Sequence, residues 1–150
     1  MRAYAMTLLA ALLLATACRK PGTPTAQKTR LQLVTQAPWK ETLNEYRRSD
    51  GSWVSVPLSA TVQGYLNAFT ATGPYGGTYA VTSGGVPVGT GTWQIIGDDT
   101  QMALNGSVTY DFGTLDDNTM QLVLNGQIAY TDPTSHATTQ YYGQRQTFVH

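Results

Sequence analysis

The sequence predicts an all-β fold, and three observations support that prediction. Apolar and polar residues alternate along most of the chain beyond residue 38, as they do in strands with one buried face. Glycine, asparagine and aspartate interrupt the alternating runs at short intervals, which is typical of turns between strands. Beyond residue 38, no stretch of ten residues has the three-and-four spacing of an amphipathic helix. Short strands joined by hairpins favour a meander that closes into a barrel or packs as a sandwich.

Residues 1–17 have the features of a secretory signal peptide. Arg2 precedes a short apolar stretch, which ends in the small residues Ala15, Thr16 and Ala17. The apolar stretch is shorter than the roughly 20 residues that a membrane-spanning helix needs. We therefore expect residues 1–17 to be removed on export, leaving no transmembrane helix.

Cys18 follows this predicted signal and is the one cysteine of the chain. A single cysteine in an exported protein cannot form an internal disulfide and needs another explanation. The small-small-Cys ending resembles a bacterial lipobox, although Ala15 stands where that motif usually has leucine. The resemblance implies a palmitate-carrying lipoprotein anchored by Cys18 in the bacterial cell envelope, with Arg19 favouring the outer membrane. The alternative is an ordinary signal peptide with a chance cysteine at the cleavage site.

Residues 18–29 are expected to form a flexible tether after lipidation. Positions 19–28 contain two prolines, one glycine and no large apolar residue, so they cannot bury enough surface to become ordered. Residues 30–150 then form one domain. The chain has nine basic and nine acidic residues, and loss of Arg2 leaves one net negative charge. Without a basic excess or a basic stripe, nucleic acid is not an expected partner.

One short helix and about nine or ten strands are expected in the domain. The helix is predicted at 29–36 and is stopped by Pro38. Asp50-Gly51, Asn105-Gly106 and Asn125-Gly126 are strong hairpin signals, because glycine accepts a positive φ. The predicted strands, some of which could merge, are 39–48, 53–58, 64–71, 76–82, 90–96, 100–105, 107–113, 119–124, 127–131 and 139–148.

Several short motifs in this order resemble the lipocalin-like domains of small bacterial lipoproteins. The motifs are Trp39-Lys40, Asp50-Gly51-Ser52-Trp53, Phe69-Thr70 with Gly77-Thr78-Tyr79, Gly91-Thr92-Trp93 and Leu115–Leu124. The resemblance covers roughly residues 30–148 and implies an up-and-down antiparallel β-barrel with an internal cavity and no defined ligand. The sequence departs from the family in two glycine-rich stretches and in a late strand rich in Gln and Tyr.

Candidate ligand contacts are the aromatic residues expected on the inner face, namely Trp39, Tyr79, Trp93 and Tyr110. Their rings would bury apolar surface, and the tyrosine hydroxyls could orient a polar group. Core packing without a ligand is the competing interpretation, because side chains fill the interior of a small barrel.

Glu41 is the candidate polar anchor. It follows Trp39 by two positions, so both side chains point to one face of a regular strand. A buried carboxyl group must be paired, hydrogen-bonded or neutral. A bulge could turn Glu41 outward, Arg47 or another basic group could pair with it, or it could line a polar ligand cavity.

The residues give little support to catalysis. His136 and His150 are the only histidines, and they lack metal-ligand spacing, so no metal or other cofactor is expected. Asp98-Asp99 and Asp116-Asp117 are interpreted as turn residues, with calcium as the alternative. The sequence predicts a non-enzymatic, membrane-anchored lipoprotein that binds a small, mostly apolar molecule. The alternative is a ligand-free interaction or structural module of the envelope that acts through its outer face; the sequence points to no particular protein partner.

Overall fold

A computed structural model describes residues 27–150 and confirms the all-β class. The predicted signal peptide, Cys18 and tether positions 18–26 lie outside the described residues. Residues 27–29 lead without helix or strand into a short helix, followed by nine strands and one further helix. The elements are α2 (Arg30–Thr35), β1 (Lys40–Arg47), β2 (Trp53–Val56), α3 (Ala60–Gln63), β3 (Tyr65–Gly73), β4 (Gly76–Ser83), β5 (Val86–Ile96), β6 (Gln101–Leu104), β7 (Val108–Leu115), β8 (Thr119–Thr131) and β9 (Thr138–Val149).

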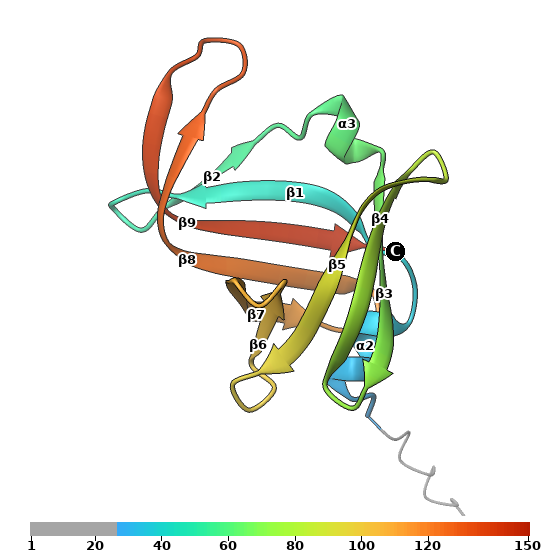
Figure 1. Ribbon diagram of the computed structural model, residues 1–150. Helices are drawn as coiled ribbons and strands as arrows, with labels where there is room; N and C mark the ends of the chain where they lie inside the picture. The colour runs from blue at the N-terminus through green and yellow to red at the C-terminus, as the bar shows by residue number, and fades with distance from the viewer. Residues whose placement is uncertain (1–26) are drawn as a thin grey trace, which may run out of the picture.

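All nine strands belong to one antiparallel sheet with the order β2-β1-β9-β8-β7-β6-β5-β4-β3. The sheet curves strongly, so that β3, β4 and β5 cross the direction of β1, β9 and β8 (Figure 1). Strands β2 and β3 end the ladder, and no ladder between them closes the sheet in the described part of the chain. Trp39, just before β1, forms an isolated bridge with Asn67 of β3. The two sides of the sheet therefore meet at a single pair.

Several sequence-predicted elements are confirmed. The helix expected at 29–36 is α2, and Thr29 and Gln32 form a capping box at its start. Asp50-Gly51 lies in the β1–β2 hairpin, and Asn105-Gly106 connects β6 to β7. Both Asn105 and Gly106 have positive φ, at 53° and 65°, as a type I′ turn requires.

The prediction of a hairpin at Asn125-Gly126 is wrong. The segments 119–124 and 127–131 form one long strand, β8, and Gly126 with φ 127° lies in an irregularity between Asn125 and Ile128. β9 pairs with β8 on both sides of this bulge, so the chain bends without reversing. A second difference is α3, which the sequence did not predict and which begins at the capping residue Ser59.

The core lies on the concave side of the curved sheet and beneath α2. Trp93, Ile95 and Met102 are buried, as their alternation predicts, and Phe69 packs edge-on against Trp93 with ring centroids 5.7 Å apart. The other members of the cluster are Val34, Trp39, Met120, Leu122 and Phe148.

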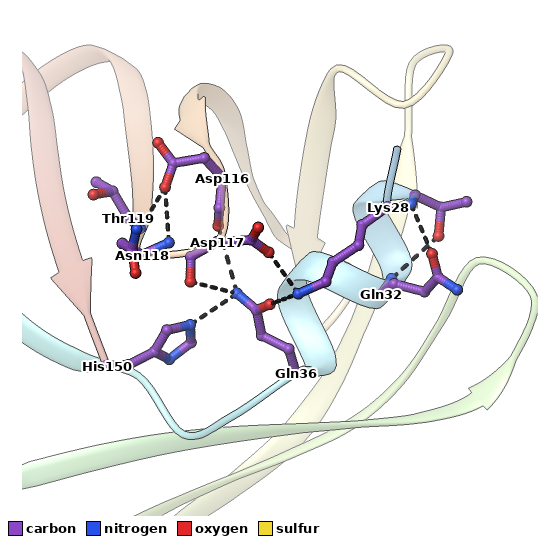
Figure 2. Close-up of polar contacts among 9 residues, drawn as sticks. Lys28, Gln32, Gln36, Asp116, Asp117, Asn118, Thr119 and His150 are labelled. Carbon is purple, nitrogen blue, oxygen red and sulfur yellow. Dashed lines mark hydrogen bonds and ion pairs between the residues drawn. The ribbon is translucent and has the colours of Figure 1, made fainter. Parts of the chain in front are cut away.

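A polar cluster fastens α2 to the turn between β7 and β8 and to the C-terminal residue (Figure 2). The Gln36 amide group donates to the Asp117 carbonyl at 3.0 Å and contacts His150 Nε2 at 2.8 Å. Lys28 bonds to Gln36 and pairs with the Asp117 carboxylate, while Asp116 accepts from the backbone of the turn. These contacts hold the helix over one end of the core, so the two ends of the domain are joined.

Candidate functional site

Glu41 is buried on the inner face of the sheet, with 8% of its surface exposed. It lies opposite Phe148 of β9, and the Gln146 Nε2 atom donates to its Oε1 at 3.3 Å. Neither of the two ion pairs found among residues 27–150 involves Glu41. The carboxyl group therefore has an amide partner but no cationic one within the described chain.

A bulge is present between Glu41 and Leu43, but it does not turn Glu41 outward, as one of the three interpretations expected. Thr42 is the extra residue, and its hydroxyl donates to the Thr147 carbonyl at 3.2 Å. The bulge resets the alternation, so that Trp39 and Glu41 before it and Tyr46 after it are all buried. Leu43 is exposed instead.

The alternative in which Arg47 pairs with Glu41 is also wrong. Arg47 donates to the Asn125 side chain and to the Tyr142 carbonyl, at 3.1 and 2.7 Å. Its guanidinium also lies 5.7 Å from the ring of Trp53. Arg47 therefore interacts with groups on the outer face and is not a partner of Glu41.

Amide side chains of β9 extend the polar surface around Glu41. Gln144 Nε2 donates to Asn44 Oδ1 at 3.1 Å and to the Tyr46 hydroxyl at 3.4 Å. Tyr46 in turn packs against Tyr130 and Tyr141, with centroid separations of 5.1 and 5.0 Å. The inner face near β1 therefore carries a hydrogen-bonded polar row beside a tyrosine cluster.

Two cavities, of about 330 and 440 Å³, open beside this row under the segment that links β2 to α3. Both are lined by Glu41, by Val56 at the end of β2, and by Pro57 and Leu58 of that segment, which lies above β1 in the view of Figure 1. The remaining walls of the smaller cavity are Asn44, Ser59, Val62, Tyr130, Thr131, Pro133 and Gln146. The larger one adds Lys40, Thr42, Leu43, Ser55 and Gln63.

Burial raises the pKa of Glu41 above its ordinary value, and the hydrogen bond from Gln146 partly offsets this effect. Burial is also the main cause of the raised pKa of Tyr46 and of Tyr110, and the nearby charge of Glu41 adds to both shifts. Glu41 therefore lies close enough to both tyrosines for its charge to influence their titration.

The predicted aromatic contacts are distributed through the core. Trp39 is fully buried, and its Nε1 atom donates to the Val34 carbonyl at 2.8 Å. The Trp93 Nε1 atom donates to the carbonyls of Thr78 and Thr70, at 3.0 and 3.3 Å. Both indoles therefore have satisfied polar atoms and closely packed rings.

The two predicted tyrosine contacts lie at the edge of the same core. Tyr79 packs on Phe69 at 5.8 Å, and its hydroxyl accepts from the Asn105 side chain at 3.0 Å. Tyr110 is half-buried against the core cluster. A third cavity, of about 440 Å³, reaches Trp93 beside the β3–β4 hairpin. None of these three cavities is lined by more than one of the five predicted contact residues.

Sequence reasoning missed Asn44, Tyr130 and Gln146 as neighbours of Glu41. For Gln146 a signal was present in the alternation of the Gln- and Tyr-rich final strand, where Gln144, Gln146 and Phe148 occur at every second position. Such spacing places all three on one face, and a buried Phe148 makes that face the inner one.

In the loop from Asp132 to His136, the Asp132 side chain hydrogen-bonds to backbone amides of the same loop. Asp132 Oδ1 accepts from the amides of Thr134 and Ser135 at 2.8 and 2.7 Å, which lowers the pKa of this carboxyl. Among residues 27–150, no three His, Cys, Asp or Glu side chains lie close enough to hold a metal ion. No helix described by the structure is long and apolar enough to cross a membrane.

Comparison with known proteins adds no family assignment. The chain matches no protein-family model, no curated protein and no solved structure. The candidate site therefore consists of Glu41 and the two cavities beside it.

Proposed function

We propose that this chain is a membrane-anchored, lipocalin-like lipoprotein that binds a small, mostly apolar molecule under the β2–α3 segment. The observation that carries the proposal is a buried carboxyl group, Glu41, in the wall of a cavity whose other walls are largely apolar. Ligand sites typically combine apolar walls with a few well-placed polar groups, in volumes of about 300–1,000 Å³. The cavities of about 330 and 440 Å³ fall within that range.

Glu41 is the strongest argument for a ligand over a simple packing defect. Removing a carboxyl group from water costs free energy that Gln146 offsets only in part. An apolar side chain would occupy the same position at a lower cost in desolvation free energy. A ligand that bonds to the carboxyl group supplies a reason for its presence.

The proposed binding position differs from the centre of the aromatic core. Trp39 and Trp93 support the sheet, while Glu41 remains the polar anchor suggested by the sequence. In this proposal the curved sheet acts as a lipocalin-like barrel, with α2 at one end and the β2–α3 segment as the cover of the ligand. The role proposed for Trp39, Tyr79, Trp93 and Tyr110 is to shape the apolar interior.

The anchoring part of the proposal rests on the sequence. Lipid on Cys18 would hold the domain to the outer membrane through residues 18–29, and several acyl chains make an effectively permanent anchor. The protein would then present its cavity next to a lipid surface, where small apolar molecules concentrate. The proposed activity is binding and release, without catalysis.

Native mass spectrometry of the purified domain, residues 27–150, tests the binding proposal. The expected spectrum contains a non-covalent adduct that is lost from a variant with a blocked cavity, Val62→Trp. Val86→Trp is the matched control, because Val86 is 63% exposed and lies outside the two cavities. Retention of the adduct by Val62→Trp would contradict binding under the β2–α3 segment. Loss of the adduct from both variants would also contradict it.

A second candidate is an interaction module that acts through its outer surface. Val86 and Val88, with 63% and 51% of their surfaces exposed, gather at the start of β5, and Tyr75 in the β3–β4 hairpin is 60% exposed. Exposed apolar groups of this kind occur at protein interfaces. Loss of a cross-linked envelope partner on Val86→Asp with Val88→Asp, without loss of a small-molecule adduct, would favour this candidate.

A further inference from the structure

The charge of the smaller cavity is unbalanced. Glu41 is the one acidic residue in its lining, and the other lining residues are apolar, amide, hydroxyl or phenol side chains. Lys40 lines the larger, neighbouring cavity but is exposed, and no ion pair joins it to Glu41. An acidic group thus lies in the wall of this cavity without a cation from the described chain.

The hydrogen bonding of Glu41 is also incomplete. An ionised carboxylate has two oxygens and about four acceptor positions. Gln146 donates to Oε1, and no hydrogen bond among the described residues reaches Oε2, which is accessible rather than buried without a partner. Oε2 can therefore accept a hydrogen bond from a ligand donor, and a bound cation would favour the ionised form of Glu41.

The tyrosine cluster provides a second feature that favours a cation. Tyr130 lines the cavity together with Glu41 and packs against Tyr46, with ring centroids 5.1 Å apart. Aromatic faces attract alkylammonium and quaternary ammonium groups, most strongly where water is excluded. Tyr46 and Tyr141 do not line the cavity; their rings, 5.0 Å apart, pack behind Tyr130 and support it.

An anionic ligand would be disfavoured in this cavity, because Glu41 would repel it. Its charge would lie beside Glu41 in a region of low dielectric constant, where repulsion between like charges is strong. No Arg, Lys or His side chain lines the smaller cavity to compensate for that repulsion.

We infer that the ligand is an organic amine, whose ammonium group pairs with Glu41 while its apolar part contacts Val56, Leu58 and Val62. This inference rests on the proposed function and narrows it to a class of ligand. The ammonium group would donate to the Glu41 carboxylate, and its attached carbons would lie against Tyr130. The apolar body would then displace water from beneath the β2–α3 segment.

Isothermal titration calorimetry with three probes of equal chain length tests the inference: octylamine, 1-octanol and sodium octanoate at pH 7. We expect octylamine to bind at least about tenfold more tightly than 1-octanol, which corresponds to about 1.4 kcal/mol. Octanoate should bind most weakly. Glu41→Gln should abolish the preference for the amine while retaining the binding of 1-octanol.

Glu45→Gln is the matched control, because it removes the same charge from the outer face of β1, where Glu45 pairs with Arg145. It should leave the amine preference unchanged, and thermal unfolding establishes that both variants are folded. Equal binding of octylamine and 1-octanol would overturn the amine inference and leave the proposed function standing. A preference for octanoate would do the same. Absence of binding by all three probes would overturn both.

Discussion

Glu41 is a carboxyl group that folding removes from water without giving it a cation. The spacing from Trp39 put both side chains on one face of a regular strand, but the sequence left open whether a bulge would turn Glu41 outward. The structure buries Glu41. The bulge at Thr42 depends on the register between β1 and β9, where Glu41 faces Phe148 and Leu43 faces Thr147. No local signal in β1 encodes that shift, because it is set by a strand about 105 residues away.

The first prediction concerns the pH dependence of stability. Because the pKa of Glu41 is raised by folding, the folded state holds this proton more tightly than the unfolded state. The group's contribution is therefore most favourable below its ordinary pKa of 4.5 and is lost as the pH rises through its raised value. Glu41→Gln should be more stable than the parent at pH 7, with the difference shrinking towards pH 4.

Urea denaturation at pH 4 and pH 7 measures this difference in the unfolding free energy. Glu45→Gln serves as the control, because Glu45 pairs with Arg145 and its removal should not stabilise the protein at neutral pH. A parent protein more stable than Glu41→Gln at pH 7, with the gap closing at pH 4, would indicate an ion pair that the structure lacks.

The second prediction concerns Trp93, whose burial the alternation of β5 predicted correctly. It is 3% exposed, and its Nε1 atom satisfies two backbone carbonyls. Trp93→Ala should lower the unfolding free energy by about 3–5 kcal/mol, since it leaves a large cavity and unpaired carbonyl groups. Trp53→Ala, on the outer face beside Arg145, should cost clearly less. Chemical denaturation of the two variants compares them, and equal losses would contradict the inner-face assignment.

For the strands and helices, the alternation of apolar and polar residues predicted where the strands lie but not how they are connected. Asn125-Gly126 suits both a type I′ turn and a bulge, because both use glycine with positive φ. The outcome depends on β9, which is long enough to pair with Leu124 and with Ala129 on either side of the irregularity. The helix α3 was missed because four residues are too few to show a helical period.

The third prediction concerns α3, which helps to position Val62 over the proposed cavity. The Ser59 hydroxyl accepts from the Val62 amide at 3.2 Å and caps the helix. Ser59→Ala should destabilise this turn by about 1 kcal/mol, the usual value for a lost N-cap. Amide hydrogen exchange should then be about fivefold faster at Val62 and Gln63. Ser107→Ala, in the β6–β7 turn, is the control; unchanged exchange at Val62 in the Ser59 variant would show that the cap is not needed.

For the whole molecule, the all-β class was predictable, but the arrangement at the two ends of the sheet was not; the predicted barrel closure is absent from the strand ladder of the described residues. Alternation identifies an inner face without specifying which strands meet at the ends. Among residues 27–150, the backbone bridge between the two sides is formed by Trp39 and Asn67, and Gln36 connects α2 to the β7–β8 turn and His150. These contacts between distant parts of the chain have no local pattern. The position of the cavity under the β2–α3 segment was unpredictable for the same reason.

The fourth prediction concerns the membrane anchor. Serine cannot take the thioether-linked lipid, so Cys18→Ser in the full-length chain should yield protein that is soluble or uncleaved. Membrane fractionation and the mass of the mature N-terminus measure the two effects. Arg19→Ala is a suitable control and should remain membrane-bound. A correctly cleaved Cys18→Ser protein that still fractionates with membranes would contradict lipid anchoring at this residue.

The most direct test of ligand binding under the β2–α3 segment is an NMR titration of the ¹⁵N-labelled domain, residues 27–150, with 1-octanol as a neutral apolar probe. Binding under the β2–α3 segment predicts saturable amide shifts centred on Glu41, Val62, Tyr130 and Gln146. It also predicts that the exposed start of β5 at Val86 and Val88 stays unperturbed. Shifts confined to Val86 and Val88, or no saturable shifts at all, would contradict the account.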